Sequence, residues 1–383
     1  MSQVRVTTPH AIYDVIIAPG LLRTLYPRLK KLNAGRPPKT FVVTSPEIWA
    51  LWHQRFLASF PPDAQPPVLF LRAGERYKRL AQVEALADQL VDAGADRDSI
   101  LLAFGGGVIG DVTGFLAAIY MRGIRYVGLP TTILAQVDSS LGGKTGVNLA
   151  SGKNLIGSFH HPLAVFSDID TLRTLPAAEL RAGLQEAIKS GIIYDAKLFR
   201  YLEQNANAVL GERAFSKTGP DPAALARVIT ASVKVKADVV SKDEKESGLR
   251  MILNFGHTIG HAIEAATHYR KLLHGEAVAW GSIAALHVSL NRGRISHEEF
   301  ARMANLILRY GPIPPFTVAP TAEAAAAKLV GLTSGDKKKR SGRRAFVLTT
   351  GIGSTEISYD VTDQELLTAT TAMLADMRVG AVR

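Results

Sequence analysis

The chain has 383 residues, of which 47% are hydrophobic and 21% charged, a composition typical of a globular protein of two or three domains. It contains no cysteine, which excludes disulfides, thiolate nucleophiles and cysteine-ligated zinc, so a metal site would need His, Asp or Glu. The first residues lack the pattern of a signal peptide, and no apolar run reaches the roughly 18 residues of a membrane helix, so a cytoplasmic protein without membrane contact is expected.

The first half of the sequence alternates strand-like and helix-like segments. Strands are predicted at residues 4–6, 13–18, 41–43, 68–71, 99–104, 126–129 and 164–167, and helices at 21–32, 47–59 and 80–93. This alternation predicts an α/β domain with a largely parallel, Rossmann-like sheet covered by helices.

From Pro176 onward the pattern becomes mostly α-helical. Helices are predicted from Pro176, at 195–210 and at 221–242, and two capping boxes and a terminal hairpin at 345–349 and 356–359 follow. The capping boxes pair Ser296 with Glu299 and Thr362 with Glu365. We therefore expect two domains, residues 1–175 and 176–383.

Residues 101–162 carry the densest set of glycines and polar side chains. The apolar run 101–104 predicts a buried strand, and Gly105 to Gly107 lead from it toward a helix over 112–120. A strand that turns through glycines into a helix offers free backbone N–H groups and a positive helix end to a phosphate. The polar residues that follow are Thr131, Thr132, Asp138, Lys144, Lys153 and Asn154. Together they favour a site for a polar, anionic ligand over a purely structural turn.

Two familiar phosphate-binding motifs match this stretch incompletely. Residues 105–110 fit the glycine spacing of the dinucleotide fingerprint, but no acidic residue lies between Asp111 and Asp138 to bind a ribose. Residues 143–145 resemble the end of a P-loop, but Asp138 occupies the place of its first glycine. An ordinary Rossmann motif and an ATPase are both disfavoured.

Three histidines and a glutamate suggest a metal site. Arg250, Asn254, His257 and His261 have the spacing of one face of a single helix, and His274 follows at the start of an apolar helix over 277–290. Glu186 lies three residues before Lys189 on the Pro176 helix. Without sulfur ligands Zn²⁺ is favoured, with Co²⁺, Fe²⁺ or Mn²⁺ as alternatives. Spacing alone pairs His257 with His261, but it cannot choose two ligands among the three histidines.

The net charge of +11 is compatible with nucleic acid or with an anionic substrate. The densest basic run, 337–340 with Arg343 and Arg344, contains no aromatic residue. A solvated loop is its preferred interpretation, a site for a small phosphate or carboxylate the second, and nucleic-acid binding the third.

Taken together, these motifs resemble the 3-dehydroquinate synthases of the sugar-phosphate cyclase superfamily. The matching segments extend over nearly the whole chain: 74–78, 105–114, 130–132, 136–140, 142–148, 152–157, 186–189, 248–264, 273–278 and 336–338. The resemblance implies a homodimer with an NAD-binding α/β domain and a helical, zinc-binding domain. It also implies conversion of a phosphorylated keto acid, 3-deoxy-D-arabino-heptulosonate 7-phosphate, to 3-dehydroquinate and phosphate by transient oxidation, phosphate elimination, re-reduction and aldol closure.

The resemblance also implies roles for individual residues. The metal ligands would be Glu186, His257 and His274. The NAD contacts would be Glu75, Lys78, Gly106, Gly107, Asp111, Thr131, Thr132, Lys144, Lys153, Thr171 and Thr174. The catalytic and substrate-binding residues would be Asp138, Lys144, Lys153, Asn154, Lys189, Glu246, Arg250, Asn254, His261 and Lys337, with Arg122 supplied by the partner subunit.

Three positions depart from the family pattern. Ser45 replaces a usual Asp or Asn, the pair at 160–161 is His-His instead of an aromatic residue and Gln, and Ser190 replaces a frequent Tyr. The alternatives are another cyclase of the superfamily, a metal-dependent NAD alcohol or glycerol dehydrogenase, and a basic nucleic-acid-binding protein. The residues expected to bind the substrate's carboxylate are all present, which ranks the related cyclase second: Lys153, Asn154, Arg250 and Lys337. Nucleic acid is not expected as a partner.

Overall fold

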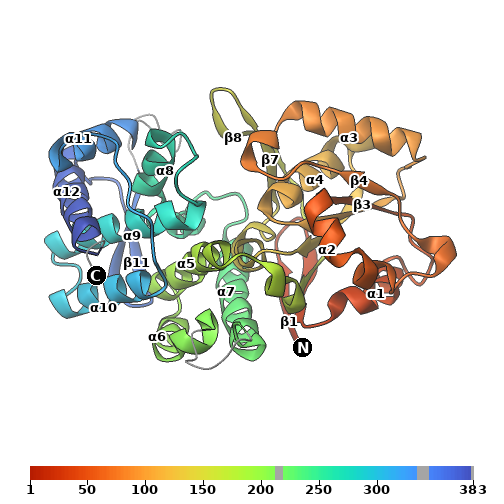
Figure 1. Cartoon of the computed structure of the whole chain (residues 1–383), viewed down its shortest axis with the longest axis horizontal. Coiled ribbons are helices and arrows are strands. Elements are labelled where there is room, and N and C mark those ends of the chain that lie inside the picture. The colour runs from red at the N-terminus through yellow and green to blue at the C-terminus, as the bar shows by residue number, and fades with distance from the viewer. Residues whose placement is uncertain (212–218, 334–344, 381–383) are drawn as a thin grey trace. The chain divides into compact units, whose positions relative to one another are not determined.

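The computed structural model describes residues 1–211, 219–333 and 345–380, which form two compact units (Figure 1). The first unit contains residues 1–176 and 225–245, and the second contains 177–224 and the chain from 246. Helix α7 (Pro222–Lys242), which we assigned to the second part, therefore belongs mostly to the first unit.

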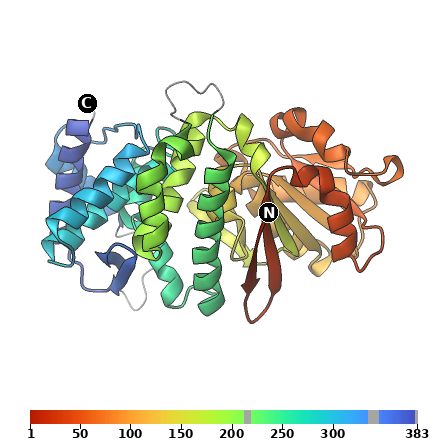
Figure 2. The same cartoon turned by 90° about the horizontal axis from the view of Figure 1, so that it is seen from below.

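A seven-stranded sheet forms the centre of the first unit. Its strands are β1 (Ser2–Thr7), β2 (Ile12–Ala18), β3 (Thr40–Thr44), β4 (Val68–Phe70), β5 (Ile100–Gly105), β6 (Arg125–Pro130) and β9 (Ala164–Asp168). Their order is β1-β2-β9-β6-β5-β3-β4, and all neighbours are parallel except β1 and β2. Figure 2 shows β1 and β2 as a hairpin at one edge of the sheet. The predicted strands and the predicted parallel arrangement are confirmed.

Apolar side chains cover both faces of this sheet, as expected when crossover helices flank parallel strands. Leu101 and Ala103 of β5 pack toward α3 (Leu80–Asp92) and α4 (Gly107–Ile119). The alternate residues Leu102 and Phe104 pack on the other face with α1 (Leu25–Leu32) and α2 (Pro46–Leu57). The two helix pairs are visible on opposite sides of the strands in Figure 1.

A second hairpin, β7 (Lys144–Leu149) with β8 (Gly152–Phe159), was not predicted. Its glycines concealed it, because glycine normally weakens strands. Here the two strands approach too closely for side chains. A Cβ on Gly146 would lie 2.4 Å from the Ile156 carbonyl oxygen, and a Cβ on Gly157 would lie 2.2 Å from the Thr145 carbonyl oxygen. The glycines are therefore required by the hairpin.

Short helical turns connect these elements. They are η1 (Leu21–Thr24), η2 (Pro62–Ala64), η3 (Glu75–Tyr77), η4 (Tyr120–Arg122), η6 (Ile169–Thr174) and the π-helical turn η5 (Ala135–Ser139). The predicted helix 21–32 is thus split into η1 and α1.

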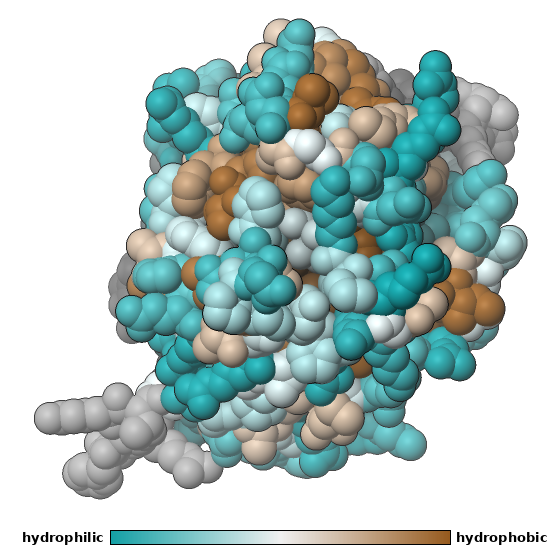
Figure 3. All heavy atoms as spheres, turned by 90° about the vertical axis from the view of Figure 1, so that its right-hand side faces the viewer, coloured by the Kyte–Doolittle hydropathy of each residue, from teal (hydrophilic) through white to brown (hydrophobic). Residues whose placement is uncertain are grey.

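The side of the molecule seen in Figure 3 is mainly hydrophilic, with hydrophobic residues in smaller groups.

The second unit is mainly helical. Its elements are α5 (Ala177–Ile193), α6 (Ala196–Leu210), η7 (Leu249–Asn254), α8 (His257–Ala266), α9 (His274–Asn291), α10 (His297–Arg309), α11 (Ala322–Thr333), α12 (Asp363–Gly380) and the hairpin β10 (Phe346–Gly351) with β11 (Ser354–Ser358). The predicted hairpin and both capping boxes are confirmed. No helix in the described ranges is long and apolar enough to cross a membrane.

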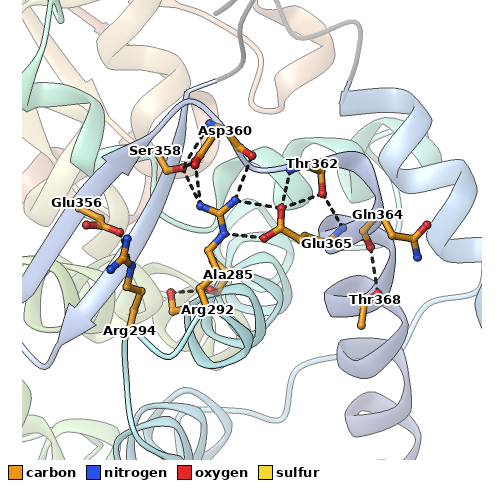
Figure 4. A network of polar contacts seen from close by, with 11 residues as sticks. Ala285, Arg292, Arg294, Glu356, Ser358, Asp360, Thr362, Gln364, Glu365 and Thr368 are labelled. Atoms are coloured by element: carbon orange, nitrogen blue, oxygen red, sulfur yellow. Dashed lines mark hydrogen bonds and ion pairs between the residues drawn. The ribbon is translucent and has the colours of Figure 1, made fainter.

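A polar network around Arg292 joins three elements of the second unit (Figure 4). Arg292, just beyond α9, donates to both carboxylate oxygens of Glu365 on α12, at 2.6 and 3.0 Å. It also donates to Asp360, at 2.9 Å, after β11. Because one guanidinium serves both carboxylates, it connects the end of α9 to the start of α12.

Candidate active site

In the first unit, the glycine-rich turn after β5 leads directly into α4. Gly106 caps this helix, which begins at Gly107, earlier than predicted. A Cβ on Gly106 would lie 3.1 Å from the side chain of Thr132, and one on Gly107 would lie 3.0 Å from the Ser139 hydroxyl. The turn therefore brings bare backbone and a helix N-terminus together, an arrangement that suits a phosphate.

A pocket lies beside this turn, within the first unit. Its walls come from the start of α4, the end of β6, η5 and the start of β7: Gly105, Gly106, Gly107, Gly110, Asp111, Pro130, Ser139, Ser140, Gly143, Lys144 and Thr145 take part, among others. The hydroxyls of Ser139 and Ser140 are buried without a hydrogen-bond partner in the described structure. Unsatisfied buried hydroxyls next to a glycine turn fit a polar ligand.

Buried Lys78 is the centre of a polar network at the same end of the sheet. Its ammonium donates to Asp111 Oδ2 and to Asn154 Oδ1, each at 2.5 Å. Asn148 ties this group to Glu75, donating to its carboxylate at 2.7 Å, and accepts from the Asn154 backbone N–H at 2.9 Å. Burial raises the pKa of Asp111, and the Lys78 ammonium opposes that rise. The structure therefore brings together four predicted residues from three separate segments of the sequence, Glu75 with Lys78, Asp111 and Asn154.

Asp138, on η5, forms an ion pair with a residue that we did not predict. Lys236 of α7 donates to its carboxylate at 2.6 Å and to its backbone carbonyl at 2.8 Å. The sequence offered no signal for this pair, because the two residues are 98 positions apart.

The remaining predicted residues of the first unit are more scattered. Lys144 is the first residue of β7 and Lys153 the second residue of β8. Arg122 is exposed and has a left-handed φ of 70°. Thr131 follows β6, Thr171 donates to the Asp168 carbonyl at 2.7 Å, and Thr174 accepts from Trp52 at 3.1 Å. Ser45 caps α2 by accepting from the Ile48 N–H at 3.4 Å, a local role that explains a hydroxyl there.

In the second unit, Glu186, His257 and His274 converge. Glu186 is on α5, His257 begins α8 and His274 begins α9. The Nε2 atoms of both histidines lie 3.8 Å from Glu186 Oε1, and one ligand atom from each residue lies within 4.8 Å of the others. Glu186 is 2% exposed, and Oε1 has no hydrogen-bond partner in the described structure. One carboxylate and two imidazoles in this arrangement fit the donor set of a catalytic zinc site.

Neighbouring groups orient these three side chains. His257 Nδ1 lies 3.1 Å from the Phe255 carbonyl, and His274 Nδ1 lies 3.4 Å from Glu264 Oε1, so both rings direct Nε2 toward Glu186. Lys189 forms an ion pair with the other oxygen of Glu186. Such outer contacts set the tautomer and orientation of metal-binding imidazoles. We did not predict Glu264, although it lies one helical turn after His261.

His261 lies next to the three convergent side chains and outside their shared position. Its ring centroid is 5.3 Å from that of His257 and 6.1 Å from that of His274. It forms a second group with Glu264 and His274, in which potential ligand atoms again lie within 4.8 Å of one another. The geometry therefore distinguishes His261 from His257, which spacing could not do.

The predicted single helix over residues 250–261 is wrong. Arg250 and Asn254 belong to the 3₁₀ helix η7, and the chain then turns at Gly256, with φ of 76°, before α8 begins. A Cβ on Gly256 would lie 2.3 Å from the Ser282 hydroxyl, so close packing on α9 requires glycine at this break. Arg250 is buried, and Asn254 donates to Glu246 at 2.8 Å. Lys337 and the basic run around it lie outside the described residues.

Comparisons with known proteins show the family of the chain. Models of the 3-dehydroquinate synthase N-terminal and C-terminal regions match residues 68–182 and 183–339. The chain is 46% identical over 378 residues to the 3-dehydroquinate synthase of Solibacter usitatus, covering 97% of this chain and 99% of that protein. For the corresponding protein of Koribacter versatilis the identity is 44%, with 96% and 97% covered.

A solved structure shares both the fold and part of the sequence. It is the 2-epi-5-epi-valiolone synthase of Streptomyces hygroscopicus subsp. jinggangensis with NAD⁺ and Zn²⁺ bound, with a TM-score of 0.83, 26% identity, and 98% of this chain and 99% of that chain covered. The two family models together cover more than half of the sequence, and the curated relatives match it nearly from end to end. The chain belongs to the 3-dehydroquinate synthase family.

Proposed function

We propose that the chain is a carbon–oxygen lyase that converts 3-deoxy-D-arabino-heptulosonate 7-phosphate to 3-dehydroquinate and phosphate, a step of the shikimate pathway. The observation that carries this proposal is the convergence of Glu186, His257 and His274 in a chain 46% identical to a named 3-dehydroquinate synthase. The related cyclase with a solved structure is less similar, at 26% identity, so the alternative activity is not favoured.

The reaction needs a temporary oxidation. Phosphate must leave next to a carbon whose proton is not acidic, and a ketone beside that carbon makes the proton acidic. NAD, when bound, would supply reversible hydride acceptance, so that the net reaction is an elimination and a ring closure. A Zn²⁺ or Co²⁺ ion, when bound, polarises the hydroxyl that is oxidised.

The chain's own residues would bind, orient and exchange protons. Glu186, His257 and His274 would hold the metal, since Glu186 is buried, both histidines are half-buried, and one donor atom from each residue lies within 4.8 Å of the others. His261 would exchange protons with the substrate or the departing phosphate, because it lies beside that set without belonging to it. The solved relative with NAD⁺ and Zn²⁺ bound supports both cofactors.

The proposed NAD site is the pocket beside the glycine turn of the first unit. The glycine turn at Gly106 and Gly107 would approach the cofactor's phosphates, with contacts from Glu75, Lys78, Asp111, Lys144, Lys153 and the threonines at 131, 132, 171 and 174. Close approach of the backbone and a helix N-terminus support this assignment.

We propose two sets of substrate-binding residues, each described within its own unit. Asp138, Lys144, Lys153 and Asn154 come from the first unit, and Lys189, Glu246, Arg250, Asn254 and His261 from the second, with Lys337 also proposed. Lysine and arginine suit a carboxylate and a phosphate. We further propose a cytoplasmic homodimer. In it, the exposed Arg122 of one subunit would contact the phosphate group of the substrate bound to the other subunit.

The test is turnover of this substrate with NAD⁺ and zinc. With less NAD⁺ than substrate, each enzyme molecule should release many phosphate ions, and the NADH absorbance should not grow. Stoichiometric NADH would instead identify a dehydrogenase. Equal turnover of a sugar phosphate that lacks the carboxylate would identify a different cyclase, and His257→Ala is the matched inactive control.

A further inference from the structure

A buried carboxylate outside the predicted site collects polar contacts from distant parts of the first unit. Glu244 follows α7, and its side chain is 6% exposed. It lies 2.6 Å from His10 Nδ1 and 2.7 Å from His161 Nε2, and accepts from the Thr8 hydroxyl at 3.0 Å. These contacts link the β1–β2 turn and the segment after β8 to the end of α7.

The protons in this cluster can be assigned from chemistry. An ionised carboxylate can only accept, so the contacting nitrogens of His10 and His161 are both donors. Burial acts to raise the pKa of Glu244, but the hydrogen bonds from His10, His161 and Thr8 outweigh it and leave the pKa below its ordinary value. Glu244 is therefore charged at neutral pH, and it orients the His161 ring.

His161 packs directly on the glycine turn before β7. A Cβ on Gly143 would lie 2.9 Å from His161 Cε1, so the ring occupies the space where a side chain would begin. Gly143 has a φ of 68°, and its carbonyl accepts from the His160 N–H at 2.8 Å. On the other side, the Gly142 N–H donates to the Tyr13 hydroxyl at 3.1 Å. The next residue is Lys144, which lines the pocket with Gly143.

We propose that Glu244, through His161, fixes the Gly142–Gly143 turn and thereby positions Lys144 for the reaction. The two are positioning residues, and the inference depends on the proposed function only for its kinetic readout. The same chain segment holds η5, another wall of the pocket, through the pair between Lys236 and Asp138. Residues 225–245 thus anchor two walls of one pocket.

The first experiment measures the turn itself. His161→Leu removes the donor while keeping an apolar group near Gly143, and His161→Gln restores an N–H donor. His53→Leu is the control, because within the described residues the His53 ring hydrogen-bonds only to the Trp49 carbonyl of its own helix. Hydrogen–deuterium exchange of residues 141–149 should accelerate about tenfold or more in His161→Leu and stay near wild type in the other two. Unchanged exchange in His161→Leu would overturn the proposal whether or not the protein turns over the substrate.

The second experiment asks whether the effect passes through Lys144. His161→Leu should lower kcat/KM by about 10–100-fold, because a small misplacement of a binding group is costly, while the bound zinc remains unchanged. In a Lys144→Ala background the same change should cost less than about threefold, as expected for coupled residues. An equal loss of kcat/KM in the wild-type and Lys144→Ala backgrounds would show that His161 has only a general structural role, which contradicts the proposal. If wild type releases no phosphate, the proposed function fails, and the exchange experiment alone decides whether the turn is held.

Discussion

Replacing His257 or His261 with alanine should have different effects on bound metal. The Nε2 atom of His257 lies 3.8 Å from Glu186 Oε1, as does that of His274, whereas His261 is grouped with Glu264 and His274. His257→Ala therefore removes one of three convergent donors, and His261→Ala leaves all three.

The expected magnitudes follow from that geometry. Loss of an outer contact to a ligand already costs about 10–100-fold in metal affinity, so loss of a ligand should cost on the order of 100-fold or more, about 2.8 kcal/mol. His257→Ala should thus be purified with little zinc and little activity. His261→Ala should retain near-stoichiometric zinc but turn over about 10²–10⁴-fold more slowly, as expected for a lost proton-transfer group.

Metal analysis of the dialysed variants, followed by zinc titration against a chelating indicator, measures both effects. Thermal unfolding with and without zinc provides the control for folding, because a ligand that binds the native state raises Tm. A zinc-free His261→Ala protein together with a zinc-loaded His257→Ala protein would refute the assignment of the ligands.

Three further changes test other parts of the structure. Ser45→Asp supplies a carboxylate for ribose hydroxyls and still caps α2, so the Kd for NAD⁺ should fall; an equal or higher Kd in calorimetry contradicts this. Arg292→Met should lower the free energy of unfolding by about 1 kcal/mol. Hydrogen bonds from Arg292, and to a smaller extent from Thr362, lower the pKa of Glu365 from 4.5 to about 2. The Tm difference from wild type should therefore shrink as pH falls from about 4.5 toward 2, and a constant difference refutes the pairing. Gly275→Ala places a Cβ 1.8 Å from a carbonyl of α5 and should lower Tm and zinc content, whereas Gly331→Ala, with open space around it, should not.

Local sequence patterns were enough to predict most of the helices and strands. Strands β2, β5 and β9 follow from short apolar runs, and the capping boxes at Ser296 and Thr362 depend on side chains three residues apart. The capping boxes can be predicted because they depend only on residues close in the sequence. The strands can be predicted because buried parallel strands are apolar on both faces. The glycine turn before α4 and the residue types of the metal site could also be predicted. Residue type alone indicates both, because glycine permits close backbone approach and histidine and glutamate are metal ligands.

The way in which residues far apart in the sequence combine depends on the folded chain. The break at Gly256 comes from packing against Ser282 of α9, so helical periodicity wrongly extended one helix across it. The pair between Lys236 and Asp138, and that between Glu244 and His161, join positions 98 and 83 residues apart. No local pattern encodes such pairs, because they form when the folded backbone brings their ends together. The same reason explains why spacing left three histidines equivalent until three helices placed two of them beside Glu186.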